Sequence, residues 1–237
     1  MSRGEMILWS RPKDINIDDM TNIVYKVLEL LKNYGDELNP KYLTVRKKAL
    51  AEEFVLDKEN LKSLLEKNID KEGYRLFNSY TSRISFFSSM DDDRSSGISI
   101  NIGRCNPRFS NTCVVHLPKG FSGFGERSKD FICLFKSLIE IFEPYYAFVP
   151  LEHNNPKTGY GFWKDDEPTY VHWMNYFDIT TAEKIGLKKV LSIDGVEKTG
   201  EGYLIVLQDD PVDLDNTQFM QNRKKVAMLL GLGKYWC

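Results

Sequence analysis

Gly97-Ile-Ser-Ile-Asn-Ile102 decides the fold class of this chain, because its apolar and polar residues alternate with a period of two. That alternation is typical of a β-strand with one buried face. Similar runs flank it, Arg83-Ile-Ser-Phe-Phe87 before and Thr112-Cys-Val-Val-His-Leu117 after, and turn residues separate the three. We therefore expect an antiparallel meander in the middle of the chain.

Helices are predicted on both sides of this meander. Asn16 and Asp57 are suitable N-caps for two helices that precede it, and Pro144 stops a strongly amphipathic helix that follows it. Asp215 or Asn216 caps a last helix, which Gly residues end near the C-terminus. The predicted helices cover residues 16–35, 57–67, 128–142 and 216–230, with a short one at 180–185.

The last third of the chain adds aromatic-rich strands. The run Tyr170-Val-His-Trp-Met-Asn-Tyr-Phe177 is predicted as a strand in which Trp173 and Phe177 face the core, while His172 and Tyr176 share the opposite face. Further strands are expected at residues 6–9 and 145–149, and a hairpin at 190–196 and 202–207. This order predicts an α+β fold, a mostly antiparallel β-sheet with amphipathic helices packed against it.

The composition is that of a globular protein, with 237 residues, of which 42% are apolar and 28% charged. We expect a single α+β domain over residues 1–237, with 144–150 as the place where a subdivision would fall. No apolar run is long enough to span a bilayer, and the four cysteines form no Cys-x-x-Cys pair. The sequence therefore predicts a cytoplasmic protein with reduced thiols and no membrane partner.

The charge is unevenly distributed along the chain. Residues 145–217 carry 13 acidic and 6 basic side chains, a net charge of −7, whereas the whole chain has a net charge of −2. A protein that binds nucleic acid directly would present a basic surface, so we expect no direct nucleic-acid ligand. We hypothesise instead a surface for a basic partner protein, formed by Asp165, Asp166, Glu167, Tyr176, Asp209, Asp210, Asp213 and Asp215.

The sequence indicates no catalytic or metal-binding arrangement. The histidines, His116, His153 and His172, lack the spacing of zinc ligands, and Asp91-Asp-Asp93 lacks the spacing of a calcium loop. A thiol of Cys113 activated by His116 is conceivable, but residues three apart in a strand point to opposite faces. We therefore expect no metal, no cofactor and no catalysis.

The order of several segments resembles the immunity protein 52 family of bacterial polymorphic toxin systems. The resemblance covers most of the chain and is clearest at Trp173-Met-Asn-Tyr176 and at Gly202-Tyr-Leu-Ile-Val-Leu207, which precedes the acidic Pro-Val-Asp loop. It includes Ser99-Ile-Asn-Ile-Gly103, Asn111-Thr-Cys-Val-Val115 and Glu143-Pro-Tyr-Tyr-Ala147. A Lys-rich N-terminal half and the pair His172-Trp173 depart from the family pattern.

This resemblance implies a non-enzymatic α+β protein that binds and neutralises a cognate bacterial toxin, often a nuclease. Carboxylates and aromatic side chains suit such a partner, because a nuclease must be basic where it holds phosphate. Two alternatives from other classes stay open. One is a small cytoplasmic hydrolase that uses a Cys/His pair, and the other is an adaptor protein with no toxin partner.

Overall fold

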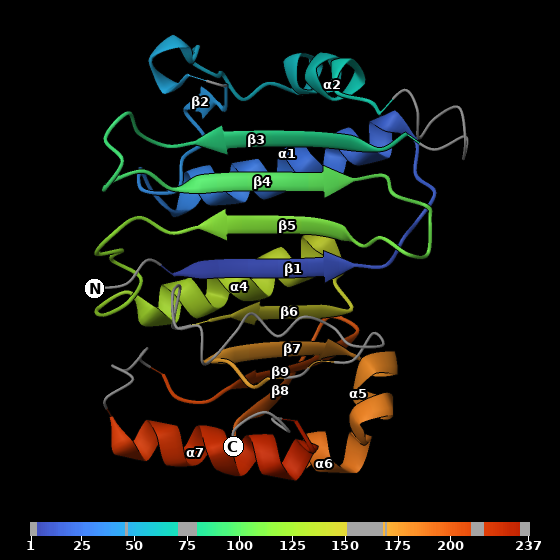
Figure 1. Ribbon diagram of the computed structural model, residues 1–237, viewed down its shortest axis with the longest axis vertical. Coiled ribbons are helices and arrows are strands. Elements are labelled where there is room, and N and C mark those ends of the chain that lie inside the picture. Colours follow the sequence, from blue (N-terminus) through green and yellow to red (C-terminus); the bar gives the residue numbers. More distant parts are fainter. Residues whose placement is uncertain are drawn as a thin grey trace.

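The computed structural model describes residues 4–45, 47–70, 80–150, 168, 170–209 and 216–232. In this part of the chain, nine strands form one sheet in the order β2-β3-β4-β5-β1-β6-β7-β9-β8, and all neighbouring strands are antiparallel (Figure 1). The strands are β1 (Glu5–Ser10), β2 (Tyr42–Leu43), β3 (Ser82–Phe87), β4 (Gly97–Ile102), β5 (Asn111–His116), β6 (Tyr146–Val149), β7 (Met174–Asp178), β8 (Val196–Thr199) and β9 (Gly202–Val206). The predicted meander β3-β4-β5 is confirmed.

Helices α1 (Ile17–Tyr34) and α4 (Ser128–Phe142) cover one face of the sheet and lie behind the strands in Figure 1. The hydroxyl of Ser10 donates to the carbonyl oxygen of Phe142 (2.5 Å), so Ser10, Leu8 and Met6 of β1 point towards these helices. The apolar stripes of both helices join the same core as this strand face. The fold class predicted from the sequence, α+β with amphipathic helices on an antiparallel sheet, is thus confirmed.

The remaining elements lie at the two edges of the sheet. Helix α2 (Lys58–Lys67), strand β2 and the short 3-10 helix η1 (Lys48–Leu50) flank β3 at one edge. Helices α5 (Ile179–Ile185), α6 (Leu187–Leu191) and α7 (Thr217–Leu230) lie at the other edge, near β7, β8 and β9. The predicted caps are confirmed, because Asn16, Asp57 and Asn216 each accept a backbone N–H of the helix that follows.

The predicted strand over residues 190–196 is wrong. These residues form the end of α6 and a turn, and β8 begins only at Val196. Gly186 has a φ of 117°, and its carbonyl oxygen accepts from the backbone N–H groups of Lys189 and Val190, which starts a new helical turn. Val190 and Ile193 are both buried. Their spacing of three residues follows a helical face rather than a strand.

The aromatic run before β7 is strand only from Met174 onward. Trp173 and Phe177 are fully buried, as predicted. The predicted placement of His172 on the face opposite Phe177 is wrong. The His172 ring stacks on Phe148 with centroids 4.4 Å apart. Phe148 pairs with Asn175 of β7, which lies on the same face of that strand as Phe177. The Asn175 side chain accepts from the backbone N–H of His172 (2.9 Å) and donates to its carbonyl oxygen (2.8 Å). This closed loop interrupts the alternation before the strand starts.

Residues 144–150, where a subdivision of the chain would fall, contain strand β6. It pairs with β1 on one side and with β7 on the other, so the sheet continues through it. Among the helices of the described residues, none combines the length and the apolar character that a membrane crossing requires.

Candidate interaction surface

The face of β3, β4 and β5 that points away from α1 and α4 carries no described helix (Figure 1). The burial of these strands alternates, with one set of side chains in the core and the other set partly or fully exposed. We call the second set the open face. Its residues are Arg83, Ser85, Gly97, Ser99, Asn101, Thr112, Val114 and His116.

Polar side chains of the open face are bonded to one another across the strands. Ser85 and Ser99, which are directly opposite, share a hydrogen bond between their hydroxyl oxygens (3.1 Å). Asn101 donates from its amide to the hydroxyl oxygen of Thr112 (2.8 Å). Such cross-strand bonds hold short side chains in fixed positions, so a partner would meet an ordered polar surface.

A hollow lies where Gly97 interrupts the row Phe87, Gly97 and His116 across β3, β4 and β5. Because Gly97 has no side chain, the space between Phe87 and His116 stays open; a Cβ at Gly97 would lie 3.3 Å from Cδ2 of His116. The cavity, which we call the Gly97 pocket, has a volume of about 330 Å³. That volume is within the range of small ligand sites, roughly 300–1,000 Å³.

One wall of the Gly97 pocket is His116, whose orientation is set by a buried acid. Nδ1 of His116 lies 2.5 Å from Oε1 of Glu5, and Glu5 is only 4% exposed. Glu5 stands opposite His116 on the neighbouring strand β1. A buried carboxylate bonded to one ring nitrogen fixes the plane of the imidazole, so this wall is rigid.

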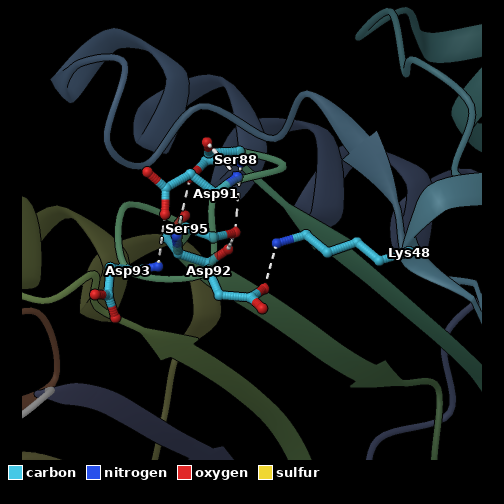
Figure 2. A network of polar contacts seen from close by, with 8 residues as sticks. Lys48, Ser88, Asp91, Asp92, Asp93 and Ser95 are labelled. Carbon is cyan, nitrogen blue, oxygen red and sulfur yellow. Dashed lines mark hydrogen bonds and ion pairs between the residues drawn. The ribbon is translucent and has the colours of Figure 1, made fainter.

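The other wall combines an aromatic ring, an ammonium group and a carboxylate. Nζ of Lys48 lies 5.0 Å from the centroid of the Phe87 ring and 2.6 Å from Oδ1 of Asp92. Figure 2 shows Lys48 reaching from its own segment to the turn that carries Asp92. The Phe87 ring also stacks on Tyr42. The Lys48 ammonium thus receives both a cation–π contact and an ion pair.

The acidic turn Asp91-Asp-Asp93 is neutralised by three cations. Asp91 pairs with Arg94, Asp92 with Lys48 and Asp93 with Lys119. The Asp91 carboxylate also accepts the backbone N–H of Asp93 (3.0 Å), which closes the turn (Figure 2). Across the described residues, no group of three or more His, Cys, Asp or Glu side chains is arranged to hold a metal ion.

The same sheet face is closed on the other side of β1. Tyr146, Phe148, Asn175 and Phe177 continue the rows of the open face through β6 and β7, but all four are buried. Tyr146 stacks on both Phe148 and Phe177. We call this set, together with His172, the closed half. Burial lowers the pKa of His172 to about 3, so its imidazole is neutral at physiological pH.

The residues proposed from the sequence lie apart from the open face or outside the described chain. Tyr176 is 2% exposed, and burial raises the pKa of its hydroxyl, so its side chain belongs to the core and not to a partner surface. Asp209 is exposed after the end of β9. Asp165, Asp166, Glu167, Asp210, Asp213 and Asp215 lie outside the described residues.

Cys113 and His116 do not form a nucleophile–base pair. Cys113 points into the core on the helix side of β5, whereas His116 lies on the open face, as the spacing of three residues predicted. Burial raises the pKa of the Cys113 thiol to about 12, so the thiolate is not populated at neutral pH.

A second hollow, of about 220 Å³, lies at the end of β1 and is lined by Arg11, Lys13, Glu143 and Asp178, among others. Its charges are paired with one another, Arg11 with Asp178 (2.9 Å) and Lys13 with Glu143 (3.6 Å). The positive φ of Glu143 is explained by its place as the C-cap of α4, where its N–H donates to the carbonyl oxygen of Ile139. These four charged side chains of the hollow are therefore already engaged in ion pairs with one another.

The sequence did not single out Glu5, Lys48, Phe87 or Gly97. One signal was present, because an isolated glycine at the start of an alternating strand marks a close approach or a missing side chain. The partners of Gly97 come from three other segments of the chain, and only the register of the sheet brings them together.

No protein-family model matches this chain, and no curated protein matches it. Membership of the immunity protein 52 family therefore stays a prediction. Among solved structures, the fold is similar to that of the Pseudomonas aeruginosa T6SS protein PA0821, with a TM-score of 0.64. The similarity covers 98% of this chain and 76% of that chain at 11% sequence identity, so it shows a shared fold alone.

Proposed function

We propose that this protein is an immunity protein, which binds a cognate bacterial toxin stoichiometrically and blocks it without catalysis. The observation that carries the proposal is the open face, an ordered and partly exposed polar sheet surface that no described helix covers. Strand side chains held by cross-strand bonds lose little entropy when a partner binds, which favours a tight and fast complex.

The similarity to a T6SS protein over nearly the whole chain supports this proposal at the level of the fold. The resemblance of several sequence segments to immunity protein 52 points in the same direction. Fold likeness alone does not carry a function, so the argument depends on the exposed surface and on the test of binding.

The toxin is proposed to be a nuclease. The support is the net charge of −7 over residues 145–217, since a basic phosphate-binding surface is attracted to carboxylates. The position of Cys113 also argues for binding over hydrolysis, because its thiol is buried on the helix side of β5, away from His116 on the open face.

The proposal predicts that a gene beside that of this chain encodes a toxin domain, and the decisive experiment uses that domain. Co-expression of the two should restore the growth that the toxin domain abolishes when it is expressed alone. Isothermal titration of the protein with a catalytically inactive toxin domain should give a 1:1 complex. Growth arrest that the protein does not relieve, together with no heat of binding, would refute the proposal.

A further inference from the structure

We infer that the Gly97 pocket binds a basic side chain of a partner protein, which takes the place that the Lys48 ammonium now holds. The inference rests on the proposed function for the identity of the partner, but the pocket can be tested without that partner. It concerns a site in the described middle of the chain, away from the acidic loops of the last third.

The first argument is the chemistry of the pocket walls. Phe87 offers the face of its ring, and Asp92 offers a carboxylate that is largely exposed to solvent. An aromatic face beside a carboxylate binds guanidinium and ammonium groups, through cation–π attraction and an ion pair. Lys48 demonstrates this preference within the protein, because its Nζ lies over the Phe87 ring and pairs with Asp92. Figure 2 shows the contact with Asp92.

The second argument is the balance of charge. Asp92 and Lys48 both line the pocket, whereas the buried Glu5 lies behind His116 and is bonded to its Nδ1. A cation that displaces Lys48 therefore finds the Asp92 carboxylate as its counter-ion. Ser96 also lines the pocket, and its buried hydroxyl has no hydrogen-bond partner among the described residues.

The third argument is the rim, which is suited to a protein and not to a free small molecule. Val45 lines the pocket and is 41% exposed. Leu50 and Met90, each two residues away from a pocket-lining residue, are 70% and 45% exposed. Exposed apolar side chains around a polar pocket are typical of protein interfaces, where a charged anchor is shielded from water by its surroundings.

Lys48 occupies the pocket before a partner binds, and an incoming cation would displace it. The four-carbon stem of Lys48 is flexible, and its ion pair with Asp92 is close to solvent, so breaking that pair costs little. An arginine from the partner would place a planar guanidinium against Phe87 and form two parallel bonds to Asp92. Lys48 would then be released to water.

The test uses N-acetyl-arginine amide as a probe and the uncharged N-acetyl-citrulline amide as its isosteric control, with the ring signals of His116 followed by NMR. The arginine probe should shift these signals saturably, and the citrulline probe should not. Asp92→Asn should weaken probe binding about threefold, while Asp93→Asn, one residue outside the pocket, should leave it unchanged. Lys48→Met should strengthen binding, because it removes the internal competitor.

Equal shifts from both probes, equal effects of Asp92→Asn and Asp93→Asn, or weaker binding to Lys48→Met would overturn the inference. The same variants are then titrated with the inactive toxin domain, where Asp92→Asn should weaken the complex about threefold and Asp93→Asn should not. A wild-type complex that is insensitive to Asp92→Asn rejects the pocket as the partner's contact. Failure of the wild-type protein to bind the toxin domain refutes the proposed function instead, while the arginine probe still decides whether the pocket binds a basic side chain.

Discussion

The two halves of one sheet face differ in how far their side chains are exposed to solvent. On β3, β4 and β5 the residues of the open face are mostly polar, and they are partly or fully exposed. On β6 and β7 the same rows continue with Tyr146, Phe148 and Phe177, and these are buried. The aromatic side chains of β6 and β7 on this face therefore belong to the core, whereas the open face on β3, β4 and β5 is partly exposed to solvent.

The physical basis of the contrast is visible in the burial patterns. The burial of side chains alternates along β4 and β5, which is typical of a sheet with one solvent-exposed face. Strand β6 is buried at all four positions, and so is β7 at its first four. A run without alternation indicates a strand that is covered on both faces.

The largest effect is expected for Trp173→Ala, beside the closed half. Trp173 is fully buried, stacks on Phe131 of α4, and donates from Nε1 to the carbonyl oxygen of Gln208 (2.9 Å). The free energy of unfolding, measured by chemical denaturation, should fall by about 3–5 kcal/mol. Trp9→Ala is the matched change at a partly exposed position, and it should cost less. Equal losses for the two tryptophans would contradict the contrast between covered and uncovered regions.

The next effect is a dependence of stability on pH that arises from His172. Its pKa is about 3 in the folded protein, because burial and the nearby Arg223 disfavour the charged ring, whereas the unfolded chain has the ordinary value of 6.5. The unfolded state therefore binds one more proton between these values, and stability is lost as pH falls below 6.5. Between pH 6.5 and 5 the loss should be about 1.5 kcal/mol.

The control for this prediction is His172→Phe, which keeps an aromatic ring against Phe148 and removes the titration. Denaturation curves collected across that pH window should show a flatter dependence for the variant. If wild type and variant lose stability in parallel, the buried neutral imidazole is not the source of the pH dependence.

A smaller effect, on binding alone, is expected for Ser99→Arg at the centre of the open face. A long charged side chain would separate the partner from this surface, and the complex with the inactive toxin domain should weaken about tenfold or more. The free energy of unfolding should fall by no more than about 1 kcal/mol, because the position is partly exposed and the cross-strand hydrogen bond to Ser85 is lost. Ser137→Arg makes the same change on α4, on the other side of the sheet. Equal loss of affinity in both variants would exclude the open face as the contact.

The smallest effect is expected for the acidic loop after β9. Replacing Asp209, Asp210 and Asp213 with Asn together should slow association with the toxin about twofold to fivefold at low ionic strength, and less at high salt. Stopped-flow mixing with the inactive toxin domain measures this rate. An on-rate that does not change at low salt would remove the acidic loop from the encounter and leave steering to other charges.

Local rules predicted much of this molecule. Asn16, Asp57 and Asn216 begin helices because a side-chain oxygen satisfies a free backbone N–H, and this chemistry is complete within four residues. Local rules were misleading at residues 190–196, which were predicted as one strand of a hairpin but form the end of α6 and a turn before β8. They were also misleading at His172, because the Asn175 side chain closes a loop that no periodicity reveals.

The candidate site depends on the order and register of the strands, which local rules do not predict. The sequence by itself determined which strands alternate, which helices are amphipathic and where they begin, because these follow from contacts between near neighbours in the chain. Only the tertiary structure decided that β1 enters between β5 and β6, which sets Glu5 beside His116, and that Lys48 reaches Asp92 over the ring of Phe87. Those contacts join residues that are tens of positions apart, and their pairing follows from the register and order of strands, which the packing of the whole core selects.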